Sequence, residues 1–232
     1  VPDSATDNYR AMLGTVYGPL LDKLGFDPAG QDGDTDPDRQ KLRRSVVGLM
    51  AGGAKDQAVR AKLASAAKAY LDGNSDAISP AYLGMGLGIL VDQGDLAFAK
   101  QLADKALSSE DASFRRAALG AIAGSGKTDV ANWLLNDFQD KRLRRNEQFA
   151  FLYGLAAAKD TRQTAYDYVF ANFDQIAQSF GPHSVDMFAT RDNALLPRFV
   201  SWRPDPESIA TDAFMFPMKN ENPYCFPPVA CI

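Results

Sequence analysis

The segment GSGKT at residues 124–128 is the part of the sequence that most resembles a catalytic motif, the end of a phosphate-binding loop. Such a loop surrounds nucleotide phosphates with backbone N–H groups and a lysine, and it needs an earlier glycine and a preceding strand. Ala121 stands where that glycine should be, and the preceding segment FRRAALGAIA has a helical pattern. Nucleotide binding through Lys127 and Thr128 is therefore a minor alternative to a turn between two helices, with Thr128 capping the second.

His183 is the only histidine in the chain. A zinc site of the HExxH kind takes two histidines from one helix, so this sequence cannot form one. As a general base, His183 would need a serine or cysteine nucleophile beside it, and no such signature is present. We expect no catalytic residue, no metal ligand and no cofactor in this chain.

Three arginine pairs, at 43–44, 115–116 and 144–145, each fall in or near the first helix of a predicted helix pair. Most such arginines are solvated or form ion pairs with acids on adjacent turns. The alternative is that some line a concave face, where the planar guanidinium suits binding of a peptide carboxylate.

Composition limits the possible partners. A net charge of -4 and a pI near 5.0 provide no basic field for phosphate backbones, so we expect no nucleic-acid partner. No apolar run approaches the roughly 18 residues that span a bilayer, and the amino end lacks the pattern of a signal peptide. The chain begins at Val1 rather than Met, so an upstream signal could have been removed. The compartment stays open between the cytoplasm and a periplasmic or secreted location.

Apolar residues recur at three-to-four spacing, which predicts amphipathic helices in succession and no strands. The first helix is expected at 8–24, with Tyr9, Leu13 and Val16 on its apolar face, and Asp36-Pro37 and Ser79-Pro80 are typical helix starts. Gly84 and Gly88 share one helix face and predict the close approach of a neighbouring helix.

Helix pairs starting near residues 37, 79, 110 and 145 predict an all-α fold, a superhelical stack of antiparallel helix pairs of the HEAT/armadillo-like α-α solenoid kind. The stack is expected to form a single domain over residues 1–213. Residues 214–232 contain four prolines and no helical period, and they predict an irregular tail. Cys225 and Cys231, the only cysteines, both lie in it, and whether they pair is left open.

Three stretches resemble a known family. NYRAMLGTVYGPLLDKLGFDP followed by DRQKLRRSVVGLMA resembles the start of the C-terminal domain of zinc aminopeptidases of the puromycin-sensitive and endoplasmic-reticulum aminopeptidase type. NEQFAFLYGLAAAKDTRQTAYDYVFANFDQIAQSFG resembles a helix pair of that domain, and DNALLPRFVSW resembles its next helix. The similarity covers residues 8–214.

The resemblance implies a HEAT-like domain that closes over a zinc-containing catalytic domain of the same polypeptide and helps to enclose peptide substrates. The family's HExxH and GxMEN motifs belong to that catalytic domain and do not occur here, so zinc is expected there and this chain alone should be inactive. Arg144, Arg145 and Gln148, at the start of the best-matching helix pair, are the predicted contacts to the distal part of the peptide. The alternative is a free-standing HEAT-like scaffold that binds another protein.

Overall fold

The computed structural model describes residues 5–27, 36–173, 175–176 and 183–224. The chain divides into two compact units, residues 1–166 and 167–232, and each is considered by itself. The boundary between the units therefore differs from the predicted one at 213/214, because residues 214–224 belong to the second unit together with the chain from residue 167 onward.

The first unit is built from helices. They are α1 (Thr6–Leu24), α2 (Pro37–Gly48) with a π-helical turn at Leu49–Gly53, α3 (Gln57–Leu71), α4 (Pro80–Gln93), α5 (Leu96–Leu107), α6 (Ala112–Ala123), α7 (Thr128–Asn136), α8 (Arg145–Ala157) and the start of α9 (Arg162–Ala171), which continues into the second unit.

Side-chain caps define the starts of five of these helices. The carboxylate or hydroxyl of the residue before each helix accepts a hydrogen bond from a backbone N–H in its first turn; these residues are Asp36, Asp56, Ser79, Asp95 and Asp111. A cap of this kind contributes about 1 kcal/mol, because it satisfies a helix donor that has no partner within the helix. The predicted starts at Pro37 and Pro80 are confirmed.

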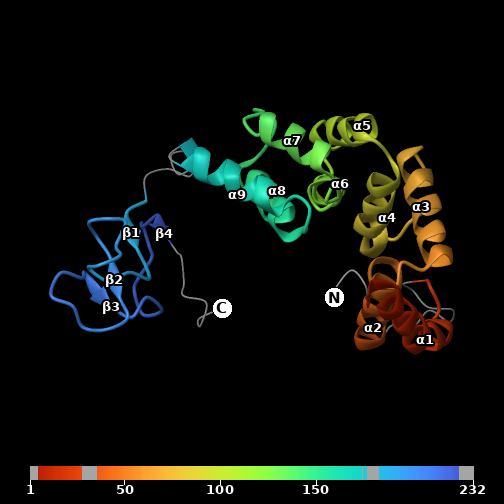
Figure 1. Cartoon of the computed structure of the whole chain (residues 1–232), viewed down its shortest axis with the longest axis horizontal. Coiled ribbons are helices and arrows are strands. Elements are labelled where there is room, and N and C mark those ends of the chain that lie inside the picture. The colour runs from red at the N-terminus through yellow and green to blue at the C-terminus, as the bar shows by residue number, and fades with distance from the viewer. Residues whose placement is uncertain (1–4, 28–35, 174, 177–182, 225–232) are drawn as a thin grey trace. The chain divides into compact units, whose positions relative to one another are not determined.

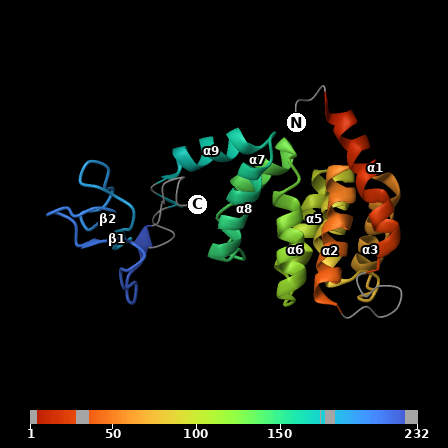
Figure 2. The ribbon, with the colours of Figure 1, turned by 90° about the horizontal axis from the view of Figure 1, so that it is seen from below.

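The helices form two layers within this unit. Helices α4, α6 and α8 pack side by side in one layer, with α2 contacting α4 before them, while α3 and α5 pack against α4 and α6 from the other layer. Figures 1 and 2 show this succession of helices, with α3, α5 and α7 along one side. The predicted all-α, solenoid-like fold is confirmed.

The pairing of the helices is shifted by one helix from the prediction. We expected the pairs to begin with α2, α4, α6 and α8, whereas the most closely packed consecutive helices are α3 with α4 and α5 with α6. The cause at α3 and α4 is Gly86, which lies against α3. A Cβ atom built there would come within 2.7 Å of the Ala67 Cβ.

The apolar face of α1 is only partly covered. Leu13 and Leu24 are buried, but Tyr9 is 38% and Val16 57% exposed, so neighbouring elements leave the predicted face uncovered at those two positions. Helical periodicity identifies a stripe of apolar side chains, but it does not show how much of that stripe a neighbouring element covers. None of the helices in the described ranges is long and apolar enough to span a membrane.

The second unit contains strands that the sequence did not predict. Strand β1 (Val185–Asp186) pairs in parallel with β4 (Pro223–Tyr224), and β2 (Val200–Ser201) pairs in parallel with β3 (Ala210–Thr211). They surround a small cluster made by Val185, Met187, Val200 and Ala213, with Phe188, Ala210 and Phe216 packed against it. The predicted irregular tail therefore contributes one strand; its residues 225–232, with Cys225 and Cys231, lie outside the described residues.

The segment DNALLPRFVSW, at 192–202, was expected to form a helix and does not. Pro197 has no backbone donor, and two donors nearby bind side chains instead. The Leu195 N–H donates to the Asp186 carboxylate at 3.1 Å, and the Thr190 N–H donates to the Asn193 side chain at 2.6 Å. Local side-chain acceptors thus compete with a helical hydrogen-bond pattern.

Candidate functional site

A groove of about 420 Å³ runs across the ends of three neighbouring elements of the first unit. These elements are helix α4, helix α6 and the π-helical turn that follows α2. Its lining combines small and charged residues: Gly48, Ala51, Gly52, Lys55, Arg60, Met85, Gly88, Ile89, Asp92, Gly120, Ala121, Gly124 and Ser125. A concave surface with a few polar groups placed on it is the usual form of a binding site.

One end of the groove carries the charged groups. Arg60, on α3, has a side chain only 12% exposed, and it donates to the Asp92 carboxylate at 2.5 Å and to the Ala51 carbonyl at 3.2 Å. These bonds join three elements, α3, α4 and the π-helical turn, and they hold the guanidinium in one place. The groove therefore has a fixed ion pair at this end.

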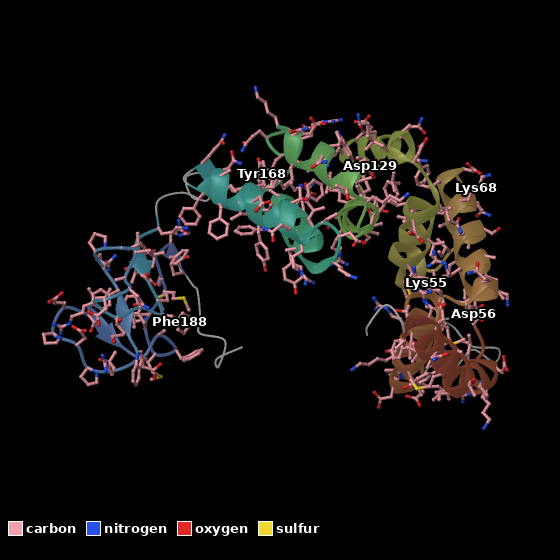
Figure 3. All side chains as sticks on the ribbon, in the orientation of Figure 1. Lys55, Asp56, Lys68, Asp129, Tyr168 and Phe188 are labelled. Carbon is pink, nitrogen blue, oxygen red and sulfur yellow. The ribbon has the colours of Figure 1, made fainter. Side chains whose placement is uncertain are left out.

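Lys55, between the π-helical turn and α3, also lines the groove. Its backbone is left-handed, with φ of 52°, and the next residue, Asp56, caps α3 by accepting a hydrogen bond from the Val59 N–H at 2.9 Å. The Lys55 ammonium forms neither a hydrogen bond nor an ion pair with another residue of the described part of the chain. Figure 3 labels Lys55 and Asp56 between the ends of α2 and α4.

The glycines on α4 have two different roles. At Gly86 a Cβ would come within 2.7 Å of Ala67 Cβ and 2.8 Å of the Leu63 carbonyl oxygen, so α3 and α4 can pack this closely only with glycine there. At Gly88 a Cβ would meet no atom within 4 Å, and at Gly84 it would only approach Ala117 at 4.0 Å. The predicted close approach at Gly84 and Gly88 is therefore wrong; the close approach occurs at Gly86.

Gly88 belongs to a regular pattern that the sequence analysis missed. Glycine pairs four residues apart occur at 48 and 52, at 84 and 88, and at 120 and 124, and each pair follows the one before it by 36 residues. Like Gly88, Gly52 and Gly120 face open space, although a glycine within a helix costs about 1 kcal/mol relative to alanine. This repeat of glycines is the feature of the sequence that could have predicted the groove. Its charged residues, Lys55, Arg60 and Asp92, belong to no sequence motif.

The three predicted contact residues lie at the start of α8, and the groove is lined by the ends of other helices. Arg144 and Arg145 are exposed, and their contact with a peptide stays a prediction. Gln148 is buried, at 8% exposure, and its Nε2 donates to the Phe138 carbonyl at 2.7 Å. The structure thus gives Gln148 a role in joining α8 to the chain that follows α7.

Two members of the arginine pairs are buried structural residues. The Arg43 Nε donates to the Leu24 carbonyl at 2.7 Å, which ties the end of α1 to α2. Arg115, on α6, binds both carboxylate oxygens of Glu147 on α8 and also donates to the Leu107 and Arg142 carbonyls. Neither guanidinium is oriented toward the groove lining.

The electrostatics of Glu147 reflect this arrangement. Burial alone would raise the pKa of Glu147, but hydrogen bonds from Arg115 and from the Arg144 N–H outweigh it and lower that pKa below its ordinary value. The bond to Glu147 in turn raises the pKa of Arg115. The pair stays charged throughout the neutral range and connects α6 with α8.

The GSGKT segment forms a turn between α6 and α7. Gly126 adopts a left-handed conformation, with φ of 70°, and the Lys127 ammonium donates to the Gly94 carbonyl at the end of α4. Thr128 is the first residue of α7, and the residue that precedes the helix, Lys127, makes no side-chain cap. The lysine that a nucleotide would need is thus engaged with the backbone.

His183 lies in the second unit, where its ring meets that of Tyr224 edge-on at a centroid distance of 5.4 Å. Its neighbour Ser184 donates to Glu221, which also binds Arg198 through both carboxylate oxygens. These contacts hold residues 221–224 beside β1. Over the ranges that the structure describes, no group of three or more His, Cys, Asp or Glu side chains is placed to hold a metal ion.

The fold is that of a helical-repeat domain with a groove lined by residues of α2, the π-helical turn, α3, α4 and α6. The family model described as the ERAP1-like C-terminal domain matches residues 1–208 of this sequence. The chain belongs to that family, and it is thus a C-terminal domain of the ERAP1 aminopeptidase type. Among curated proteins, the search finds no significant match to the chain.

Proposed function

We propose that this chain forms part of the substrate chamber of a zinc-dependent aminopeptidase and contacts the distal part of the peptide. The zinc and the catalytic residues belong to a catalytic domain of the same polypeptide, in keeping with the family to which the chain belongs. This chain's own contribution is then binding: the groove offers charges and open backbone, and its Asp92 carboxylate is held by Arg60.

The proposal rests on the groove formed by the ends of α4, α6 and the π-helical turn. It has room for an extended segment, its floor contains glycines that hold no side chain in the way, and its charged end is fixed by the bonds of Arg60. An extended peptide has free main-chain donors and acceptors, so an open floor lets it approach the helix ends closely.

The test uses the full-length enzyme and two substrate classes. Replacing Gly88 with glutamine places a long side chain in the groove without meeting an atom of the chain at Cβ. We expect KM for peptides of about ten residues to rise while aminoacyl-amide substrates, which are too short to reach the groove, keep their kinetics. The triple replacement of Arg144, Arg145 and Gln148 by alanine tests the predicted contacts in the same assay.

Equal effects on long and short substrates would contradict a distal binding role. Peptidase activity that requires no metal, measured with chelator, would contradict zinc dependence. A chain that binds a folded protein but no peptide would instead support the free-standing scaffold.

A further inference from the structure

A cavity of about 270 Å³ lies between α3, α4 and α5. Apolar side chains form its walls, and they come from Leu71 on α3, Leu90 on α4, and Phe98 and Leu102 on α5. Among the described residues, the cavity shares no lining residue with the groove. A concave apolar surface of this size suits a small ligand.

One end of the cavity is apolar and is held by the turn between α4 and α5. Gly94 follows α4, and a Cβ atom built there would come within 2.8 Å of the Phe98 Cδ1 atom. The phenyl ring therefore lies directly against the backbone of this turn. Leu102, one helical turn further along α5, is only 2% exposed. These side chains form a surface that a hydrocarbon chain can cover.

The opposite end of the cavity carries two ammonium groups. Lys105, on the last turn of α5, donates to the Leu71 carbonyl at the end of α3, which uses one of its three donors. Lys68, on the last turn of α3, is exposed and makes no hydrogen bond or ion pair within the ranges that the structure describes. Figure 3 labels Lys68 near the end of α3.

The charges of the cavity lining do not cancel. Asp72, which follows α3, is the one acid of the lining, against the ammonium groups of Lys68 and Lys105. The lining therefore has an excess of positive charge, although the chain as a whole has a net charge of -4. The Gln101 amide, one turn before Lys105, adds a neutral donor. Donors at one end and hydrocarbon walls at the other match an anionic amphiphile.

We propose that this cavity binds a medium-chain fatty acid. Its carboxylate accepts hydrogen bonds from Lys68 and Lys105, and its chain lies toward Phe98 at the turn between α4 and α5. The charge-assisted bonds orient the head, and removal of the chain from water supplies most of the affinity. A free acid is the ligand rather than a bilayer lipid, because the cavity has room for only a small molecule. The site goes beyond the proposed function, since peptide binding in the groove uses other residues.

Isothermal titration calorimetry on the full 232-residue chain measures the binding of octanoate, hexanoate and octyltrimethylammonium. We expect octanoate to bind, and hexanoate to bind about fifteenfold more weakly, because each buried methylene contributes about fourfold in affinity. Octyltrimethylammonium carries the same chain with a cationic head, and it should show no measurable binding.

Variants of the lining test where octanoate binds. Lys68→Met should weaken octanoate about twofold to fivefold, the range of an exposed charge pair, whereas Lys68→Arg should keep most of the affinity. Gln101→Trp places a bulky ring at the cavity from an exposed position and should abolish binding. The matched control is Lys23→Met, which removes one exposed cation from the last turn of α1, outside the cavity lining, and should leave Kd unchanged. Thermal unfolding shows whether each variant is folded.

Each failure has a separate meaning. No binding of octanoate, or equal binding of octanoate and octyltrimethylammonium, overturns the proposal, and full binding by folded Gln101→Trp places the ligand elsewhere. Equal losses in Lys68→Met and Lys23→Met would show an effect of net charge, and the assignment to Lys68 would be wrong. Cosedimentation with phosphatidylglycerol vesicles distinguishes a membrane lipid from the free acid. If the chain binds these vesicles and not octanoate, the cavity belongs to a membrane-facing surface and the proposal is wrong.

Discussion

Arg115 on α6 and Glu147 on α8 form a two-bonded ion pair, with Nε to Oε1 at 2.5 Å and Nη2 to Oε2 at 2.8 Å. Both side chains are largely buried, at 6% and 11% exposure. Arg115 also donates to the Leu107 and Arg142 carbonyls. Its guanidinium thus joins four parts of the chain: α6 itself, α8, the end of α5, and the loop that follows α7. This pair holds together the part of the helical array that lies beyond the groove.

Removing one partner of this pair should be strongly destabilising. Arg115→Met leaves the Glu147 carboxylate buried without its cation, and we expect a loss of about 3–5 kcal/mol in the free energy of unfolding. Urea denaturation followed by circular dichroism measures it. Arg116→Met, which removes the next arginine of α6, an exposed one, is the control and should leave the unfolding midpoint close to wild type.

The same pair predicts a pH dependence. The pKa of Glu147 is lower in the folded chain than its ordinary value of 4.5, so the unfolded chain takes up its proton first as pH falls. The stability contributed by this carboxylate is fully present above about pH 4.5 and is lost as pH falls through the lower folded pKa. Unfolding measured between pH 7 and pH 3 should show this loss.

Glu147→Gln is the comparison for that measurement. It cannot titrate, so its stability should fall less steeply with acid than that of wild type, even though it is the less stable protein at pH 7. Glu221, whose pKa is lowered to about 2 by Arg198 and Ser184, remains in both proteins and does not affect the difference. Parallel curves for the two proteins would contradict the assignment.

Two glycines of one helix should respond in opposite ways to the same substitution. Gly86→Ala forces its Cβ against Ala67 and the Leu63 carbonyl, and we expect it to destabilise the chain by about 1–3 kcal/mol. Gly88→Ala meets no atom within 4 Å and should stabilise by up to about 1 kcal/mol through helix propensity. Thermal unfolding of both variants decides this; a loss at Gly88 would mean that the fold itself needs glycine there.

At the start of α8, substitutions of Gln148 and of the exposed Arg145 should differ in their effect on stability. Gln148→Leu removes the bond to the Phe138 carbonyl from a buried position, and we expect a loss of about 1–3 kcal/mol. Arg145→Ala alters an exposed side chain and should leave stability near wild type. If the triple alanine variant raises KM, the Arg144→Ala, Arg145→Ala double variant shows whether the effect comes from the arginines or from weakened folding at Gln148.

Helix starts were predictable from the sequence because a cap acts over two or three residues. Asp36 with Pro37 and Ser79 with Pro80 each place an acceptor beside the N–H groups that need it, and no distant part of the chain takes part. The helix succession and the solenoid-like class follow from the same local pattern. The resemblance to the aminopeptidase C-terminal domain, carried by those helical stretches, was confirmed by the match over residues 1–208.

Only the tertiary structure decided which face of each helix packs against a neighbour and which is left open. Gly86 and Gly88 are two residues apart and look alike in the sequence, yet one lies against α3 and the other opens to the groove, because helix packing sets the side on which each one falls. Arg115 looked like a candidate for the binding surface until its partner, 32 positions away, came into contact with it. Strand β1 forms because Pro223 and Tyr224 return beside it. Each of these features depends on contacts between distant segments, which local periodicity and capping do not encode.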